Sequence, residues 1–468
     1  MTFLSTIAAL AATVQPSPST LIEEWLTSLN AGSLEACRVF HRRAPWPAKA
    51  DEVAEQSFAL FRRTGGFTRV RDLPDREGRT EVLVRAKLID DYRIFAIGKN
   101  AEGALEPSVT SPPRALLLKE VPVATRETLP SRVQAYIQGL ARAGRFSGAY
   151  ALAEGDVVLA KGAFGLAHRG FGVKNRFDTK FNLASMGKMF TAIAIGRLVD
   201  AGKLRFDTKI GEILPDYPNA TVRDQVTLRM LLSHSSGLGD MFTPAFVEGS
   251  KDRWKTVDSV LPLFQDEPLR FEPGKGQSYS NAGYVLLGKV IEKVSGQEYW
   301  RFLEEQVFDP LGMKDTGAFE MDRDTPNLAF GYTNEPLDGS VTLGEPYNNL
   351  FMHIAKGSPA GGSFSTVPDL LKFATGLRSG KLVRPATLRT MTTLSQGFPD
   401  YGLGFQLRPL PSGGMAYGHG GGFPGISGEL IIYPGSGYTF VALANYDLEA
   451  MRAVARVRML VGDVISDH

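Results

Sequence analysis

A serine and a lysine lie three positions apart in Ser185-Met186-Gly187-Lys188, at the start of an apolar stretch. On a helix this spacing puts the two side chains one turn apart on the same face. A serine hydroxyl is a weak nucleophile at neutral pH, but an amine that burial keeps neutral can take its proton while the oxygen attacks a carbonyl carbon. The pair therefore predicts a nucleophile for acyl transfer, with Lys188 as the base.

The residues that follow predict the helix that would carry this pair. Phe190, Ile193, Ala194 and Leu198 recur at helical spacing, and Gly202 favours a C-terminal end. The serine would then lie at the helix N-terminus, where free backbone N–H groups favour a negative oxygen. A surface helix with a solvated serine and lysine would show the same string, so other motifs have to decide between the two interpretations.

A second motif, Tyr279-Ser280-Asn281, follows a Phe-Glu-Pro-Gly turn at 271–274 and precedes an apolar stretch that predicts a helix. Tyr-x-Asn also occurs elsewhere in the chain, so its setting singles it out. A nearby lysine cation lowers the pKa of a tyrosine, which could then share or give up its proton. The amide of Asn281 offers both a donor and an acceptor that could orient the lysine and the substrate.

A third motif is His419-Gly420-Gly421-Gly422, on a predicted strand near the C-terminus. Glycines leave a strand edge open, so we expect His419, Gly420 and Gly421 to orient a substrate lying along it. The same glycines satisfy a dinucleotide-binding pattern, Gly-x-Gly-x-x-Gly. A strand rather than a helix follows them, and a proline interrupts the run, which excludes that interpretation.

In this order, and together with Leu-Leu-Ser-His-Ser-Ser-Gly-Leu at 231–238, the three motifs resemble the penicillin-recognising serine hydrolases, in the branch related to class C β-lactamases. That branch includes β-lactamases, D-Ala-D-Ala carboxypeptidases, D-aminopeptidases and family VIII carboxylesterases. The resemblance covers about residues 129–468. It implies an α+β fold of the β-lactamase/transpeptidase type, with a central antiparallel sheet flanked by helices and a helical subdomain.

The resemblance also implies roles for individual residues. Ser185 would be the acylated nucleophile, Lys188 its base, and Tyr279 the acid and base of acylation and deacylation, with Asn281 orienting the substrate. The oxyanion would be bound by the backbone N–H groups of Ser185 and Gly422. No cofactor and no metal is implied.

One departure from the family pattern affects the expected substrate. Members that act on penicillins carry Lys-Thr-Gly or Lys-Ser-Gly at the third motif, where this chain has His419. A lysine cation attracts a substrate carboxylate, whereas a histidine, with a reference pKa of about 6.5, is mostly neutral. We therefore expect a carboxylesterase-type serine hydrolase with weak or no β-lactamase activity.

Three alternatives stay open at this point. Two are enzymes, a D-amino-acid peptidase or D-Ala-D-Ala carboxypeptidase and a β-lactamase. The third is a sensor that binds β-lactams or muropeptides without turnover, against which the retention of Ser185, Lys188, Tyr279 and Asn281 argues. In each case the partner is a small molecule, an ester, an amide or a β-lactam.

Sequence patterns divide the chain into four parts. Residues 1–19, apolar and then polar, resemble a signal peptide; 20–104 predict helices followed by strands, a small α+β accessory domain; 105–128, rich in proline, predict a linker; and 129–468 form the hydrolase domain. A hairpin pattern at 148–162 and closely spaced strands after residue 403 predict one antiparallel sheet assembled from distant segments. Export to the periplasm or the medium is expected, with a cytoplasmic location as the alternative.

The composition excludes several other functions. The net charge of +2 comes from 52 basic and 50 acidic residues, which form no basic stripe, so nucleic acid is not an expected partner. A single cysteine and six scattered histidines leave no metal-ligand pattern. No segment beyond the N-terminus approaches the roughly 20 apolar residues of a membrane span.

Overall fold

The structure, a computed structural model, describes residues 16–465 except 47–48, 77, 336–344, 396–399, 411–412 and 448. The chain divides into two compact units, Met1–Pro122 and Val123–His468. Residues 1–15, the greater part of the expected signal peptide, lie outside the described residues.

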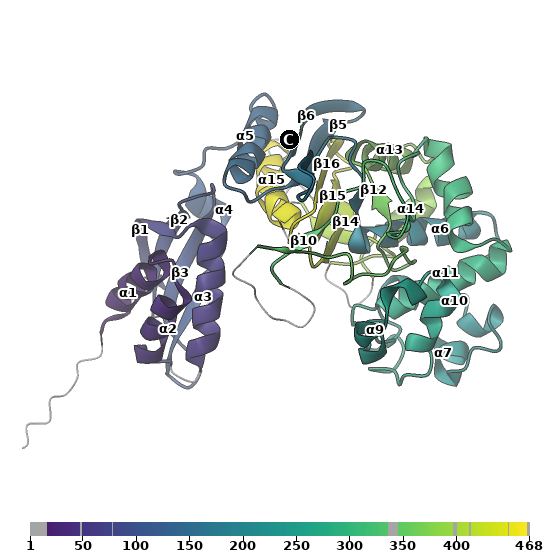
Figure 1. The fold of residues 1–468 in the computed structure, drawn as a ribbon, viewed down its shortest axis with the longest axis horizontal. Helices are drawn as coiled ribbons and strands as arrows, with labels where there is room; N and C mark the ends of the chain where they lie inside the picture. The colour runs from purple at the N-terminus through teal and green to yellow at the C-terminus, as the bar shows by residue number, and fades with distance from the viewer. Residues whose placement is uncertain are drawn as a thin grey trace, which may run out of the picture. The chain divides into compact units, whose positions relative to one another are not determined.

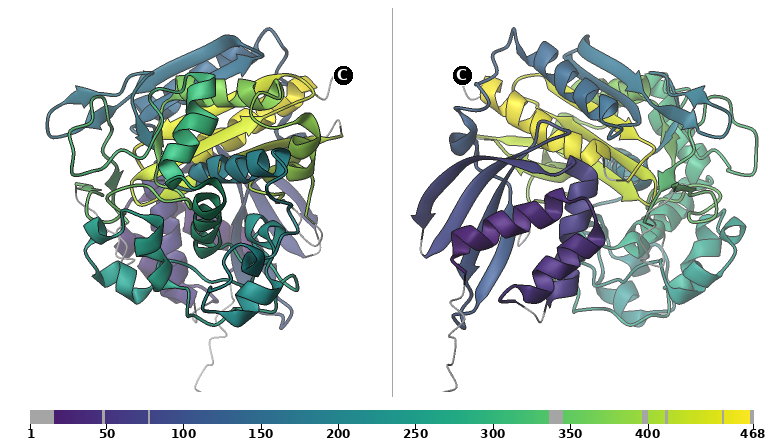
Figure 2. Two further views of the ribbon diagram at one scale, coloured as in Figure 1. Left: turned by 90° about the vertical axis from the view of Figure 1, so that its right-hand side faces the viewer. Right: turned by 60° about the vertical axis from the view of Figure 1, so that its left-hand side comes forward.

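The first unit packs three helices on a four-stranded antiparallel sheet with the strand order β1-β2-β3-β4 (Figures 1 and 2). Its elements are α1 (Pro18–Asn30), α2 (Leu34–Arg43), α3 (Ala50–Thr64), β1 (Phe67–Arg76), β2 (Arg79–Ala86), β3 (Tyr92–Lys99) and β4 (Leu105–Thr110). The core between the two layers is apolar and aromatic, and Trp25, Phe67 and Phe95 lie at its centre.

The fourth strand of this sheet corrects the expected linker. Residues 105–110 pair with β3, with Pro107 opposite Ile97, and α4 (Arg114–Leu117) follows soon after. Because β4 is an edge strand, a proline without an N–H group is tolerated there. The same position leaves most of its side chains only partly buried, so the strand lacks the apolar alternation by which sequence reasoning finds strands.

The second unit is built around a six-stranded antiparallel sheet with the strand order β13-β14-β15-β16-β5-β6. Its strands are β5 (Gly148–Glu154), β6 (Val157–Phe164), β13 (Gln406–Pro409), β14 (Met415–Phe423), β15 (Ile426–Ile432) and β16 (Tyr438–Ala444). β5 pairs with β16, with Leu152 opposite Phe440, so the early hairpin extends the late strands. This arrangement confirms the predicted fold class, with one sheet assembled from distant segments.

Helices cover both faces of this sheet (Figure 1). α5 (Leu129–Arg142) and α15 (Glu449–Ile465) pack on one face, and α6 (Lys188–Asp200) and α13 (Val367–Arg378) pack on the other. A mostly helical region includes α7 (Ala220–Gln225), α8 (Leu228–Leu232), α9 (Pro244–Glu248), α10 (Val257–Val260), α11 (Asn281–Ser295), α12 (Tyr299–Leu303) and α14 (Pro385–Met391). Short strand pairs complete the unit: β7 (Leu166–His168) with β8 (Val173–Lys174), β9 (Phe181–Asn182) with β12 (Phe364–Ser365), and β10 (Tyr332–Thr333) with β11 (Tyr347–Asn348).

Helix α6 is central to the second unit and is buried on nearly all sides. A helix that is apolar all round belongs inside a core, which explains why its sequence lacks a polar face. Among the described helices, none combines the length and the apolar character needed to cross a membrane.

Candidate active site

Ser185 lies in a single 3-10 turn, η2 (Ala184–Gly187), and Lys188 is the first residue of α6. The preceding residue, Ala184, has φ of +42°, a left-handed conformation that is rare for a residue with a side chain. Hydrogen bonds hold it there: its N–H donates to Asn182 Oδ1 at 2.9 Å, and its carbonyl accepts from Gly362 N at 3.1 Å. These hydrogen bonds therefore fix the orientation of the backbone at Ser185. The serine lies in the 3-10 turn that precedes α6 and not in the α-helix itself.

The amine of Lys188 lies 3.1 Å from Ser185 Oγ. The lysine side chain is fully buried, and this burial lowers its pKa to about 7 against a smaller opposing effect of the Asp240 charge. Near neutral pH a large fraction of Lys188 is therefore the neutral amine that a general base must be.

The other contacts of this amine decide which way its lone pair faces. Lys188 Nζ lies 2.6 Å from Asn281 Oδ1 and 2.6 Å from the carbonyl oxygen of Ala360. A neutral amine has two N–H groups and one lone pair, and two acceptors take both N–H groups. The lone pair is left for the third neighbour, the hydroxyl of Ser185, which is the arrangement that proton removal requires.

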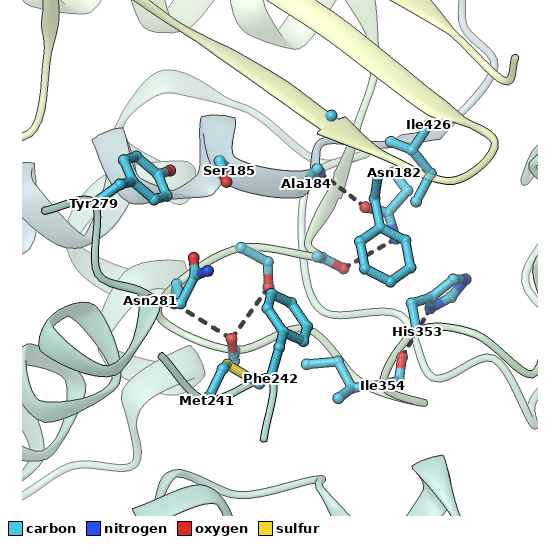
Figure 3. Close-up of a pocket in the computed structure, with 16 residues that line it drawn as sticks. Asn182, Ala184, Ser185, Met241, Phe242, Tyr279, Asn281, His353, Ile354 and Ile426 are labelled. Carbon is cyan, nitrogen blue, oxygen red and sulfur yellow. Dashed lines mark hydrogen bonds between the residues drawn. The ribbon is translucent and has the colours of Figure 1, made fainter. Parts of the chain in front are cut away.

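Tyr279 completes the group of reactive side chains. Its hydroxyl is directed toward Ser185 (Figure 3). Lys188 Nζ lies 4.7 Å from the centre of the tyrosine ring. Burial raises the pKa of Tyr279, and the smaller effect of the neighbouring Ser185 hydroxyl opposes this only in part. The shift is opposite to the lowering expected from the sequence, because burial, which disfavours the charged phenolate, is its largest cause. Tyr279 is thus a neutral phenol that can donate a proton.

The segment 231–238 positions the Tyr279–Asn281 turn. Nδ1 of His234 accepts a hydrogen bond from Ser280 N at 3.1 Å, and the imidazole lies 4.3 Å from the Tyr279 ring. Burial lowers the pKa of His234 well below its ordinary value, so it is neutral. Ser280 in turn caps α11 by accepting from Gly283 N at 2.9 Å. His234 therefore supports the tyrosine and the helix start.

The backbone of Gly422 faces the same cavity as Ser185. β13 begins at Gln406, which lies opposite Gly418, and Gly420 N, two residues further along β14, donates to the Gln406 side chain at 3.1 Å. Backbone groups two residues apart on a strand point the same way, so Gly422 N is directed past the start of β13. This placement suits the N–H of Gly422 as an oxyanion donor.

The other members of the third motif do not line this cavity. His419 is buried, 2% exposed, with Nε2 2.8 Å from the hydroxyl of Tyr401, and burial lowers its pKa to about 3. A Cβ atom at Gly421 would lie 2.1 Å from the carbonyl oxygen of Leu183, so a glycine is needed there for packing against the nucleophile turn. A substrate-orienting role for His419, Gly420 and Gly421 stays a prediction.

The cavity beside Ser185 is mainly apolar (Figure 3). Its lining residues, all within the described chain, include no lysine, arginine, aspartate or glutamate: Asn182, Ala184, Ser185, Met241, Phe242, Tyr279, Asn281, His353, Ile354, Ser358, Ala360, Gly361, Gly362, Gly422, Phe423 and Ile426. Burial lowers the pKa of His353, so this imidazole is neutral as well. Elsewhere in the described part of the chain, no group of three or more histidine, cysteine or carboxylate residues is placed to hold a metal ion.

Sequence reasoning missed two residues near this site. Asp240 receives hydrogen bonds from Asn281 Nδ2, and Tyr401 holds His419. Asp240 directly follows Gly239, just beyond the 231–238 motif, and its partner is 41 residues away. Only that closeness to the motif could have drawn attention to it.

Comparison with known proteins identifies the family of the second unit. The sequence model described as Beta-lactamase matches residues 133–462, and the chain therefore belongs to this family. Within it, the protein is a serine hydrolase. The match begins after the first unit.

Two curated relatives and one solved structure illustrate the range of the family. Penicillin-binding protein 4 of Amycolatopsis lactamdurans is 30% identical over 319 residues, 64% of this chain and 81% of the relative. Esterase EstB of Burkholderia gladioli is 30% identical over 318 residues, 62% of this chain and 79% of the relative. The crystal structure of a penicillin-binding protein from Bacillus halodurans has a TM-score of 0.62 and 31% identity, covering 69% of this chain and 99% of that one.

Proposed function

We propose that this protein is a carboxylesterase-type hydrolase that cleaves uncharged, apolar esters through an acyl-enzyme on Ser185. The observation that carries the proposal is the cavity that Ser185 and Tyr279 share: aromatic and aliphatic side chains line it, and no charged side chain does. An apolar acyl group gains by leaving water in such a cavity, whereas a carboxylate loses its hydration without a cation to replace it. Similarity to an esterase supports this preference.

The first half of the reaction uses the contacts around Ser185. Its oxygen attacks the ester carbonyl carbon while its proton moves to the lone pair of Lys188, 3.1 Å away. The negative carbonyl oxygen is bound by the backbone N–H groups of Ser185 and Gly422, each worth about 3 to 4 kcal/mol of transition-state stabilisation. The carbon–oxygen bond to the alcohol then breaks, Tyr279 donates a proton to the leaving oxygen, and the Lys188 ammonium returns one to Tyr279.

The second half reverses these roles with water. Water attacks the acyl carbon and loses a proton through Tyr279 to Lys188, and the same two N–H groups bind the oxyanion. The bond to Ser185 breaks, and the serine oxygen recovers the proton. Ester and water are thus converted into acid and alcohol, and each side chain returns to its starting form.

The state of His419 limits activity on β-lactams. A penicillin or cephalosporin carries a carboxylate, for which the third motif of related enzymes supplies a lysine cation. Here His419 is neutral and bonded to Tyr401. A β-lactam should therefore bind weakly, and its turnover should be low.

A turnover screen tests the proposal. Purified protein is assayed with p-nitrophenyl esters of increasing acyl length, D-amino-acid anilides and a chromogenic cephalosporin, with Ser185→Ala as the control. We expect the highest kcat/KM for an ester of an uncharged acyl group and no turnover by the variant. Faster turnover of the anilides would indicate a D-amino-acid peptidase. Preference for the cephalosporin, or a lasting penicillin adduct without turnover of any substrate, would contradict an esterase.

A further inference from the structure

Asp240 takes no part in the proposed reaction steps, but it contacts Asn281, which in turn contacts the base Lys188. Asn281 Nδ2 is 3.1 Å and 3.0 Å from its two carboxylate oxygens, and the opposite end of the same amide, Oδ1, is 2.6 Å from Lys188 Nζ. The carboxylate also accepts a hydrogen bond from the backbone N–H of Phe242, a cavity residue, at 3.2 Å. Asp240, Asn281 and Lys188 therefore form one chain of contacts that ends at Ser185.

The two ends of an asparagine amide differ chemically, and this gives the chain a direction. The NH2 end only donates and the oxygen only accepts, while an ionised carboxylate only accepts. With Asp240 present, the NH2 end must face the carboxylate and the oxygen must face the lysine. Hydrogen bonds to an ionised carboxylate are also stronger than those between neutral groups.

The reverse orientation would disable the base. A turned amide would aim an N–H group at Lys188 Nζ, where it would either occupy the lone pair of the neutral amine or repel the ammonium. In both cases Ser185 would lose the acceptor for its proton. The orientation of one amide therefore decides whether the lysine can act.

We infer that Asp240 is a positioning residue for the general base: it holds the amide of Asn281 in the orientation that leaves the lone pair of Lys188 to Ser185. The inference rests on the proposed role of Lys188. Asp240 touches neither the lysine nor the nucleophile, and it acts through Asn281.

Asp240 also acts through its charge, which allows a test that a purely structural role would not pass. The described titratable groups around Lys188 are Tyr279 and Tyr284, whose rings face its amine, and the neutral imidazoles of His234 and His419. The negative charge of Asp240 raises the pKa of Lys188 against the larger effect of burial. Without that charge the pKa of Lys188 should fall, and the acid limb of the pH–rate profile should move to lower pH.

The experiment compares Asp240→Asn, Asp240→Glu and the intact protein on the best substrate of the screen, from pH 5 to 9. For Asp240→Asn we expect a kcat lower by about ten- to a hundredfold, little change in KM, and an acid limb displaced to lower pH. Asp240→Glu should recover part of the loss and restore the limb. Glu248→Gln, which removes an exposed carboxylate on nearby α9, is the matched control and should behave like the intact protein.

A second readout separates this inference from the proposed function. The rate at which a fluorophosphonate labels Ser185 reports activation of the serine without depending on any ester. If the intact protein is not labelled, the proposed function fails. If it is labelled and Asp240→Asn is labelled as fast, or loses activity with the acid limb unmoved, the positioning role of Asp240 is overturned. Circular dichroism melting curves verify that each variant is folded.

Discussion

Each unit contains a base that burial favours in its neutral form, His41 in the first unit and Lys188 in the second, and the two bases have different roles. In the first unit, Trp46 Nε1 donates to His41 Nδ1 at 3.0 Å, and His41 Nε2 lies 3.0 Å from Ser57 Oγ, which also accepts from Trp25 Nε1 at 2.8 Å. Burial lowers the pKa of His41 to about 4. The imidazole is neutral, and both of its nitrogens are occupied.

Lys188 is as fully buried as His41, and burial likewise favours its neutral form. The two bases differ in whether a lone pair remains free. Two protein acceptors take the N–H groups of Lys188, and its lone pair faces a serine at the wall of a cavity. A buried base can react when one of its hydrogen-bonding positions has no other protein partner and faces a cavity that a substrate can enter. The closed cluster around His41 can only support the fold.

The largest effect is expected from removing the base. Lys188→Met keeps the length and apolar stem of the side chain but supplies no lone pair. We expect kcat to fall by about a hundredfold to ten-thousandfold, the range that general bases contribute. Steady-state hydrolysis measures the loss, and a melting curve separates it from unfolding. Retained activity would show that another group takes the proton of Ser185.

The histidine cluster should affect stability rather than catalysis. The folded pKa of His41, about 4, lies below its reference value of 6.5, so protonation favours the unfolded chain. The stabilisation is present above about pH 6.5 and is lost as the pH falls toward 4, by an amount on the order of 3 kcal/mol.

His41→Gln isolates this effect, because a glutamine can accept from Trp46 and donate to Ser57 but does not titrate. Denaturant unfolding followed from pH 7 to pH 4 should show a smaller decline for the variant than for the intact protein. Its kcat at pH 7 should be unchanged. Parallel pH profiles of unfolding would contradict the neutral, closed state of His41.

The titration of Lys188 should appear in the pH dependence of catalysis. Since burial lowers the pKa of Lys188 to about 7, the active neutral form is lost as the pH falls below that value. We expect kcat to drop by about tenfold per pH unit on the acid side, as for a single essential base. A profile flat down to pH 5 would argue against the lysine as the base in the substrate complex.

The smallest effect is expected from Tyr401→Phe. This change removes the hydrogen bond between Tyr401 and His419 but alters none of the residues proposed to react. The change leaves Nε2 of His419 buried without its partner, at a cost of about 1 to 2 kcal/mol in the free energy of unfolding. We expect kcat to change less than threefold. A loss as large as that of Lys188→Met would place Tyr401 in the reaction itself.

Sequence reasoning was most reliable where short motifs hold the information. Ser185 and Lys188 are local partners, and the resemblance joined them to Tyr279 and Asn281, which the structure brings to the same place. The fold class was also predictable, because short, nearly continuous apolar runs mark the fully buried strands of the sheet, such as β15 and β16.

Other features depend on packing that no local pattern records. β4 escaped notice because an edge strand can carry proline, and Asp240 because its partner lies far along the chain. The predicted direction of the Tyr279 pKa shift was wrong, since the sequence places a lysine nearby but does not show how strongly burial acts on the phenol. The motif at 419–422 was found, yet only the structure shows that His419 turns toward Tyr401.

The missing side chain at Gly421 has a consequence for the geometry of the reaction. Strand β14 and the turn before α6 touch there main chain to main chain, since any Cβ would overlap the oxygen of Leu183. The two amides proposed to bind the oxyanion belong to these two separate segments, one residue beyond Gly421 and two beyond Leu183. Their spacing is thus set by a contact that does not depend on substrate binding. A methyl group at residue 421 would push the two segments, and with them the two amides, apart.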